Sequence, residues 1–421
     1  MNIIKYLRDR ELISQITNEY EITKILEKEK IAIYCGFDPT SDSLHIGHLM
    51  PILCLKHFQL QGHKPIIVIG GATSLIGDPS FKINNRKINN LNTIKKWSDK
   101  IKSQLSLLLD FNCGYNSAII INNYNWFKDV KILPFLQNIG KNVSINKIIN
   151  KDALKQRIGK FSKGLSFSEF SYNLFQSYDF VFLNKKYNVK LQIGGSDQWG
   201  NITSGIDLTK KINNNCVYGL TVPLMTKTDG TKFSKSGLNT IWLDSKKTTP
   251  FDFYQFWIKT SDDNVFKFIK CMTFINSKQI KLLYKESLNN KNQCIAQTFL
   301  AKEITKFIHG VNNLCYVKYI TEILFKRNLK KLTQTEFDKL IKYGIKYVKI
   351  KNDSNLIMAL IQSKLSKSIS QAKKMIISNA IKINGDTQIY TNYKFEIKDK
   401  LYNKYTILCK GKKNFCLLYW K

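Results

Sequence analysis

Two histidines, His45 and His48, stand three residues apart in a turn that follows the apolar stretch 31–35. On a helix this spacing puts both imidazoles on one face, and Gly47 between them lets a flat group approach the backbone. A helix start also collects unpaired N–H groups and the positive end of the helix dipole, which suits a polyphosphate. The pair can therefore stabilise charge that develops on a phosphate in a transition state. For an isolated pair, half of a metal site or simple packing is the alternative.

The segments around this pair predict a nucleotide-binding α/β fold. Residues 31–35 predict a strand, and Asp42 or Ser43 is expected to cap a helix that continues through Phe58. The apolar run 64–70 predicts a second, buried parallel strand, so strand, helix and strand make a βαβ unit. Its ligand crevice is expected at the carboxyl ends of these strands.

Further polar side chains stand in a glycine-rich loop and on one helix. In the loop 70–80 the backbone can approach a ligand, and Asp78 can meet a cationic group; an ordinary turn is the alternative. Downstream, Tyr172, Gln176 and Asp179 recur at i, i+4 and i+7, which places three polar groups on one helix face amid aromatic residues. We interpret this face as a ligand pocket, with a mixed packing surface as the alternative.

A second strand, glycine turn and helix are predicted at 189–201. Gln192 lies on the expected strand, and Asp197 and Gln198 lie at the expected helix start. Asp197 is placed to contact ribose hydroxyls, although capping the helix would also explain it.

Two polar loops carry basic residues at short spacing. Lys82 and Arg86 lie in an Asn-rich loop, and Lys232 and Lys235 lie three apart among small residues. Such a loop can close over a triphosphate and then release pyrophosphate. A Lys-rich surface loop is the alternative for the second pair.

The length and charge of the chain indicate several domains and a polyanionic partner. A chain of 421 residues exceeds the size at which one core stops growing, so two or three domains are expected. The net charge of +35 favours nucleic acid as the partner. However, 61 of the 66 basic residues are Lys, which an A+T-rich genome would over-supply along with Asn and Ile. Codon bias is therefore an alternative source of part of the charge.

The cysteines and the N-terminal segment predict a cytoplasmic protein. The nine cysteines are scattered without regular spacing, which fits reduced thiols and predicts no protein-bound metal. The first residues lack the apolar core of a signal peptide. No stretch approaches the ~20 apolar residues of a transmembrane helix, so no membrane partner is expected.

Taken together, these motifs resemble those of a class I aminoacyl-tRNA synthetase, and in detail those of the bacterial-type tyrosyl-tRNA synthetases. His45-Ile-Gly-His48 is similar to the HIGH signature of that class, and Lys232-Phe-Ser-Lys235-Ser236 stands for KMSKS, with Phe in place of Met. The 184 positions from His48 to Lys232 suit a Rossmann fold that carries an insertion. Stretches that look like the tyrosine branch are Tyr34–Thr40, Gly77–Ser80, Glu169–Asn173 and Gly194–Asn201.

The resemblance implies an α/β fold class with three domains. They are a Rossmann-type parallel-sheet catalytic domain over 1–247 with a dimer-forming insertion at about 125–190, a helical tRNA-proximal domain over 248–350, and a small α+β S4-like RNA-binding domain over 351–421. The last segment carries fourteen lysines against four acids, a net charge of +10 in 71 residues, which favours phosphate contact there. The resemblance also implies a homodimer, with Phe167 and parts of about 125–165 near the interface.

The family's chemistry implies that L-tyrosine and ATP form tyrosyl-adenylate and pyrophosphate, after which tyrosine passes to tRNA(Tyr). Mg²⁺ would travel with the ATP, without a tightly bound protein metal. Residue by residue, the resemblance implies four groups. They are Tyr34 and Asp179 at the phenol hydroxyl; Asp78, Tyr172 and Gln176 at the ammonium; Cys35, Gly36, Asp38, Thr40, His45 and His48 at ATP, with Gln192, Asp197 and Gln198 around the adenylate; and Lys82, Arg86, Lys232 and Lys235 at the pyrophosphate.

Two alternatives remain at this point. The tryptophanyl relatives share the nucleotide signatures, but Tyr34 with Asp179 and the S4-like tail argue against them. A non-enzymatic RNA-binding protein on a synthetase scaffold would predict lost signatures, whereas both are present.

Overall fold

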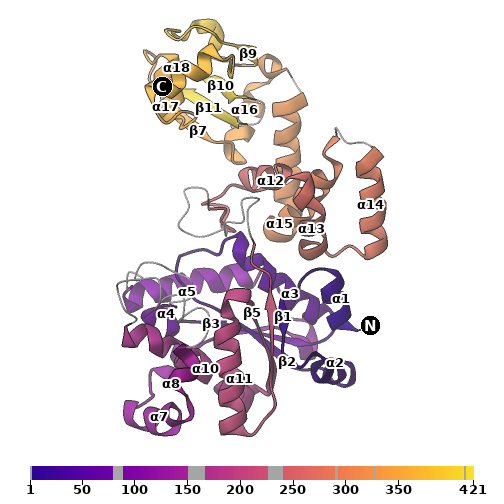
Figure 1. The fold of residues 1–421 in the computed structure, drawn as a ribbon. Helices are drawn as coiled ribbons and strands as arrows, with labels where there is room; N and C mark the ends of the chain where they lie inside the picture. The colour runs from indigo at the N-terminus through magenta and orange to yellow at the C-terminus, as the bar shows by residue number, and fades with distance from the viewer. Residues whose placement is uncertain are drawn as a thin grey trace. The chain divides into compact units, whose positions relative to one another are not determined.

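The computed structural model describes residues 2–78, 89–149, 166–225, 240–289, 293–326, 328–411 and 414–421 (Figure 1). The chain divides into two compact units, the first made of 1–244 with 261–296 and the second of 245–260 with 297–421. The boundaries at 247 and 350 drawn from the sequence stay predictions.

A six-stranded sheet in the order β1–β6–β5–β2–β3–β4 lies at the centre of the first unit. Five strands run parallel, and the short β1 pairs antiparallel with β6 at one edge. The strands are β1 (Gln15–Ile16), β2 (Ala32–Phe37), β3 (Lys64–Ile69), β4 (Ile119–Asn122), β5 (Val189–Gly195) and β6 (Tyr218–Val222). The strands predicted at 31–35 and 64–70, and the one predicted at the start of 189–201, are confirmed.

The strand order determines where a ligand can bind. β2 pairs with β3 on one side and with β5 on the other, so the chain reverses its direction of winding between these neighbours. In open parallel sheets, ligands bind outside the carboxyl ends of the strands at such a point. The candidate site is therefore expected beyond Phe37 and Gly195.

Alternation along β2 sends neighbouring side chains to opposite faces of the sheet. Tyr34 joins a buried core with Phe180 of α10 and with Ile66 and Val68 of β3.

The helices of the first unit are α1 (Ile3–Asp9), α2 (Glu19–Lys28), η1 (Ile46–His48), α3 (Leu49–Leu60), α4 (Thr73–Ile76), α5 (Leu91–Leu105), η2 (Gly114–Asn116), α6 (Tyr124–Phe127), α7 (Ile132–Asn138), η3 (Gly140–Asn142), α8 (Ile145–Ile149), α10 (Phe167–Tyr187), η4 (Ser196–Gln198), α11 (Trp199–Asn213), α13 (Asp262–Met272) and α14 (Ser277–Asn289).

A buried arginine ties the segment 261–296 to the N-terminal part of the first unit. The Arg10 guanidinium donates to the carbonyl of Lys270 at 2.8 Å, to that of Thr273 at 2.5 Å and to that of Ile275. These carbonyls lie at and just after the C-terminus of α13, where intrahelical partners run out. A cation there also interacts favourably with the helix dipole.

The second unit combines helices with a small sheet in the order β7–β11–β10–β8–β9. Two helices share a core with this sheet, in which Leu360 and Ala372 pack with Leu408 and Leu418. This is the small α+β fold expected at the C-terminus, and β7 joins it by pairing parallel with β11. Its elements are α12 (Pro250–Ile258), α15 (Ile295–Lys326), η6 (Leu329–Lys331), α16 (Gln334–Lys342), β7 (Tyr347–Ile350), α17 (Leu356–Gln362), α18 (Ile369–Ile377), β8 (Ile381–Ile383), β9 (Asp386–Thr387), η7 (Ile397–Asp399), β10 (Tyr405–Lys410) and β11 (Asn414–Trp420).

The helices that the structure describes include none long and apolar enough to cross a membrane. All nine cysteines are free thiols.

Candidate active site

The two histidines lie on the short helix η1, which leads directly into α3. His45 is the N-cap of η1, and its Nδ1 accepts the Gly47 N–H at 3.1 Å. The His48 Nδ1 accepts the His45 N–H, also at 3.1 Å, so the two imidazoles close a capping box with ring centroids 4.0 Å apart. A neutral imidazole that accepts at Nδ1 carries its proton on Nε2. Both rings therefore hold an Nε2–H donor at the start of a helix.

The prediction that Asp42 or Ser43 caps this helix was wrong. The Ser43 hydroxyl donates to the Leu44 carbonyl at 2.8 Å, and the helix begins after His45. Histidine is not among the residues that sequence patterns recognise as caps, because Ser, Thr, Asp and Asn are the usual ones.

The carboxyl end of β2 leaves open space beside the backbone. Gly36 is exposed in a strand that is otherwise largely buried. Among the residues described, no heavy atom outside Gly36 and its two chain neighbours lies within 4 Å of the position that a Cβ would take there. A flat ligand can therefore approach this backbone, in the region that the strand order marks as the crevice.

Two buried polar side chains, those of Tyr34 and Asp179, lie near this edge of the sheet. The Asp179 carboxylate accepts the Asn123 Nδ2–H at 3.1 Å and the Trp126 Nε1–H at 3.0 Å. The Tyr34 hydroxyl is buried and has no hydrogen-bond partner among the residues described. An unpaired buried hydroxyl costs about 1–3 kcal/mol, so this hydroxyl is suited to a ligand that carries its own hydrogen-bonding group.

Burial raises the pKa of Asp179 to about 8, although the hydrogen bonds from Asn123 and Trp126 act in the opposite direction and the charge of Asp38 adds to the increase. Burial also raises the pKa of Tyr34 well above its usual value, and the charge of Asp179 raises it further. Displaced pKa values are typical of functional sites, where burial and charge are used to set protonation.

A second network joins Tyr172 to the loop after β3. The Tyr172 hydroxyl donates to Asp38 Oδ2 at 2.8 Å, and the Thr73 hydroxyl donates to Asp38 Oδ1 at 2.7 Å. A Cβ at Gly70 would lie 1.8 Å from Asp38 Oδ1, so only glycine fits there. Asn123 Nδ2 also donates to Thr73 Oγ1 at 3.2 Å, which connects this network to Asp179.

Amide groups complete the polar cluster. Asp78 Oδ2 accepts from Gln198 Nε2 at 3.0 Å. Gln176 Oε1 and Gln192 Oε1 are buried and lack a partner within the described ranges. Because Gln192 lies opposite Tyr34 in the β2–β5 register, the strands bring these two residues together although 158 positions separate them.

The structure thus brings most of the predicted site residues together, and it does not describe the others. Tyr34, Asp38, Tyr172, Asp179 and their partners form connected clusters, whereas the roles assigned to each stay predictions. The nucleotide-side role of Asp38 is one of these, since its carboxylate accepts from Tyr172 and Thr73. Lys82, Arg86, Lys232 and Lys235 lie outside the described residues, as do positions 150–165 of the predicted insertion.

Asn123 and Trp126 were missed by the sequence reasoning. Asn123 directly follows β4, and the carboxyl end of a parallel strand was the signal that could have found it. No comparable signal marks Trp126.

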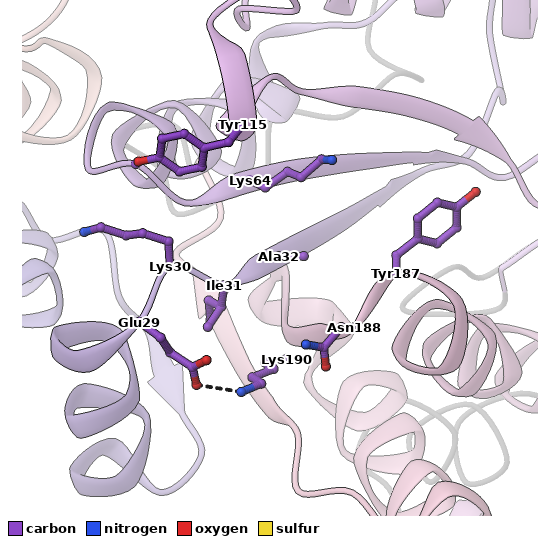
Figure 2. Close-up of a pocket in the computed structure, with 10 residues that line it drawn as sticks. Glu29, Lys30, Ile31, Ala32, Lys64, Tyr115, Tyr187, Asn188 and Lys190 are labelled. Atoms are coloured by element: carbon purple, nitrogen blue, oxygen red, sulfur yellow. Dashed lines mark hydrogen bonds and ion pairs between the residues drawn. The ribbon is translucent and has the colours of Figure 1, made fainter.

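A separate pocket of about 220 Å³ lies at the amino ends of β2, β3 and β5 (Figure 2). Glu29 pairs with Lys190 at 2.6 Å, and the side chains of Lys30 and Lys64 extend in different directions. None of the predicted site residues lines this pocket. It lies at the amino edge of the sheet and is not the candidate active site. Within the described part of the chain, no group of three or more metal-ligating side chains is arranged to hold a metal ion.

Comparisons with known proteins agree with this geometry. Residues 26–326 match the family of class I tRNA synthetases (W and Y), and residues 336–418 match the C-terminal domain of SYY-like tyrosine–tRNA ligases. The tyrosine–tRNA ligase of Cronobacter sakazakii is 51% identical over 420 residues, covering 100% of this chain and 98% of the relative. The enzyme of Escherichia coli strain 55989 is also 51% identical over 420 residues, with 100% and 99% coverage.

A solved structure shows the same fold over much of the chain. The C-terminally truncated mitochondrial tyrosyl-tRNA synthetase of Aspergillus nidulans is 29% identical, with a TM-score of 0.70 over 77% of this chain and 94% of that chain. A tryptophanyl-tRNA synthetase of Encephalitozoon cuniculi, 15% identical with a TM-score of 0.54, shares the fold alone.

A parallel nucleotide-binding sheet with paired histidines at a helix start, matched by the W and Y family over 26–326, defines a class I synthetase. Within that class the chain belongs to the tyrosine–tRNA ligases, as the full-length identity and the C-terminal match show. It is an aminoacyl-tRNA synthetase with tyrosine–tRNA ligase activity, and the tryptophanyl and non-enzymatic alternatives are set aside.

Proposed function

We propose that this chain carries out both steps of tyrosine attachment in the cytoplasm, with its activation site at the carboxyl edge of the first unit's sheet. A carboxylate oxygen of L-tyrosine attacks the α-phosphorus of ATP, the bond to pyrophosphate breaks, and tyrosyl-adenylate forms. The tyrosyl group then passes to the 3′ end of tRNA(Tyr), and AMP leaves. The observation that carries this proposal is the buried Tyr34 hydroxyl, unpaired in the described structure, beside Asp179 in an otherwise apolar core.

Substrate tyrosine would occupy the cluster of α10 and β2. Its phenol hydroxyl accepts from Tyr34 and donates to Asp179, so the Tyr34 hydroxyl gains a hydrogen-bond partner. Its ammonium lies among Asp78, Tyr172 and Gln176, whose oxygens supply negative charge and acceptors. Phenylalanine would leave the Tyr34 hydroxyl without a partner and Asp179 without the phenol donor in a buried site, which is the physical basis of selectivity.

ATP would lie across the end of β2. The open space at Gly36 accepts a flat group, and the Nε2–H groups of His45 and His48 donate to charge that develops on phosphate oxygens. No covalent nucleophile is needed, because holding the two substrates in line and stabilising charge is sufficient. Mg²⁺ enters with ATP as part of the substrate. The remaining assignments are Cys35, Asp38 and Thr40 on the ATP side, Gln192, Asp197 and Gln198 around the adenylate, and Lys82, Arg86, Lys232 and Lys235 around pyrophosphate.

Exchange of labelled pyrophosphate into ATP tests the activation step. The protein is incubated with MgATP and either tyrosine or tryptophan, and exchange is expected with tyrosine alone. Exchange with tryptophan instead, or with neither amino acid, would contradict the assignment of the pocket. Aminoacylation of tRNA(Tyr) with labelled tyrosine then tests the second step.

The homodimer part of the proposal is supported by apolar side chains exposed along one region. Ile132 and Leu133 of α7, Ile145 of α8 and Phe167 of α10 are each more than half exposed, at 71%, 76%, 58% and 77%. Apolar residues concentrated in this way mark a protein interface. Sedimentation is expected to show a dimer, and Leu133→Asp with Phe167→Asp is expected to give monomers. A wild-type protein that sediments as a monomer at micromolar concentration would contradict the homodimer.

Tyrosine binding is expected to tighten as pH rises toward 8. The phenol donates to the ionised Asp179, whose pKa burial raises to about 8. Below pH 8 binding must first ionise this group, so the KM for tyrosine should fall by up to about tenfold per pH unit and level off above 8. Steady-state exchange from pH 6.5 to 9 measures this, and Asp179→Asn should remove the dependence. A flat profile in the wild type would contradict the role of Asp179.

The same carboxyl gives a stability prediction of opposite sign. Because its pKa is raised from 3.8 on folding, its contribution to stability is fully present below pH 4 and is lost as pH rises through 8. Asp179→Asn is expected to flatten this part of the pH dependence of unfolding, measured without substrates. An unchanged slope in the variant would show that other groups cause it.

The C-terminal α+β domain is expected to serve the tRNA and not the activation step. A protein that ends at Lys326, where the class I match and α15 end, keeps every proposed activation residue. It should form tyrosyl-adenylate at close to the full rate and aminoacylate tRNA poorly. A cut near Asp353 would leave β7 without its partner β11, so the earlier end is preferred.

The salt dependence of tRNA affinity further separates tRNA binding from amino-acid activation. The full-length protein should lose tRNA affinity more steeply with salt than the truncated one, by roughly 0.7–0.9 log unit per log unit of salt for each phosphate contact removed. Equal aminoacylation with equal salt slopes would show that the +10 segment does not anchor the tRNA.

A further inference from the structure

A chain of three side-chain amides ends on Asp78. Asn173 of α10 donates from Nδ2 to Asn201 Oδ1 of α11 at 2.7 Å, and Asn201 donates from Nδ2 to Gln198 Oε1 at 3.1 Å. Gln198 of η4 then donates from Nε2 to Asp78 Oδ2 at 3.0 Å. Asn173 is 4% exposed, so the chain starts inside the protein and ends in the candidate site.

The order of donors in this chain leaves each amide one orientation. An amide has a donating end and an accepting end. Because the Asn201 oxygen accepts from Asn173, its nitrogen must face Gln198, and the Gln198 nitrogen must then face Asp78. If Gln198 were reversed, its oxygen would face the Asp78 carboxyl oxygen, and two acceptors would meet.

This orientation of the amides has a cost at Asn173, where the chain of amides starts. The Asn173 Oδ1 is buried and has no hydrogen-bond partner in the parts of the chain that are described. An unpaired buried acceptor costs about 1–3 kcal/mol, and a leucine of similar size would not incur this cost. Local costs of this kind are expected where a fold serves a site.

We propose that Asn201 and Asn173 are positioning residues for the ammonium group of tyrosine. They direct the Gln198 amide so that it holds one oxygen of Asp78, which fixes the rotation of the carboxylate about its Cβ–Cγ bond. The ammonium then meets a carboxylate that is already oriented. The inference rests on the proposed ammonium role of Asp78 and adds two residues that act through Gln198.

Two small ligands isolate the ammonium contact. Tyramine has the phenol and the ammonium without a carboxylate, and 3-(4-hydroxyphenyl)propanoate has the phenol and the carboxylate without an ammonium. Their inhibition constants against tyrosine are measured in pyrophosphate exchange. Asn201→Leu removes both amide bonds without adding charge, and it should weaken tyramine roughly tenfold while the propanoate is unchanged. The KM for tyrosine should rise with little change in kcat.

Three further variants make the result specific. Asn201→Ala, which leaves room for water, should shift the ratio of the two inhibition constants in the same direction and covers the case in which the leucine variant folds poorly. In a Gln198→Leu background, Asn201→Leu should add nothing, because its effect passes through Gln198. Asn213→Leu is the matched control: it removes two amide bonds from the same helix, to the Val181 carbonyl and to Asn184, and should leave the ratio unchanged.

Asp78→Asn separates failure of this inference from failure of the proposed site. If that variant weakens tyramine selectively and Asn201→Leu does not, the amide chain has no positioning role. If Asp78→Asn affects the two ligands equally, Asp78 is not the ammonium site, and the inference falls with it. An effect of Asn213→Leu equal to that of Asn201→Leu would also overturn the inference, since general loosening of α11 would explain both.

Discussion

Asp179→Ala is expected to lower the kcat/KM for tyrosine in pyrophosphate exchange by about a hundredfold or more and to remove much of the discrimination against phenylalanine. A hydrogen bond to a charged group contributes about 1.5–3 kcal/mol, and a buried donor left unpaired costs about 1–3 kcal/mol. The alanine variant loses the bond to the phenol, whose O–H is then a buried donor without a partner. Trp126 Nε1 also loses its acceptor, whereas Asn123 Nδ2 keeps Thr73 Oγ1, and these two changes act on stability. Since about 1.4 kcal/mol is tenfold in rate, the lost bond and the unpaired phenol donor together reach a hundredfold.

Phenylalanine should be affected in the opposite direction. In the wild type it would leave the Tyr34 hydroxyl without a partner and the Asp179 carboxyl without the donor that the tyrosine phenol supplies, and in the alanine variant the second of these penalties is gone. The kcat/KM values for tyrosine and phenylalanine, measured on the same preparations, give the ratio directly. A variant that used tyrosine normally and still excluded phenylalanine would show that the phenol is read elsewhere.

Tyr34→Phe is the matched control for this experiment. It removes the unpaired buried hydroxyl and keeps the ring that packs edge-on against Phe180 at 5.1 Å. We expect a smaller loss of selectivity than for Asp179→Ala, together with a slightly higher melting temperature in the absence of substrates. If Tyr34→Phe lowers the selectivity for tyrosine and raises the melting temperature, the Tyr34 hydroxyl serves ligand binding at a cost in stability.

The second large effect is expected at the paired histidines. His48→Ala and His45→Ala should each lower the rate of adenylate formation by about 10²–10³, equal to about 2.7–4 kcal/mol, as for the removal of a single donor to a transition-state oxyanion. Tyrosine affinity should change little, because a contact made in the transition state alone affects kcat and not ground-state binding. Single-turnover formation of adenylate at saturating tyrosine and MgATP measures the effect.

An asparagine variant distinguishes the catalytic nitrogen from the structural one. In His48→Asn the side-chain oxygen can replace Nδ1 as the acceptor of the His45 N–H, which keeps the turn. No donor then stands at the position of Nε2. Adenylate formation should remain low while the melting temperature stays near that of the wild type. Full activity of His48→Asn would show that the imidazole serves only to cap η1.

Local patterns in the sequence were sufficient for the elements that carry the site. The helix α10 and the common face of Tyr172, Gln176 and Asp179 were predicted because the helical repeat alone determines which positions share a face. The strands β2, β3 and β5 were predicted for a similar reason, since apolar runs bounded by glycine need a buried sheet. The spacing within His45-Ile-Gly-His48 likewise placed two imidazoles together, as the ring distance of 4.0 Å confirms.

The partners of these side chains depended on the tertiary structure. Asp38 and Tyr172 are 134 positions apart, and Asn123 and Asp179 are 56 apart. No repeat of two or 3.6 residues relates such positions; strand order and register bring them together at one edge of the sheet. The displaced pKa of Asp179 has the same origin, because burial is a property of the assembled core. Residue types and short spacings thus determined which groups were available for chemistry, and the winding of the parallel sheet decided which of them meet, since only the folded chain determines distances between residues far apart in sequence.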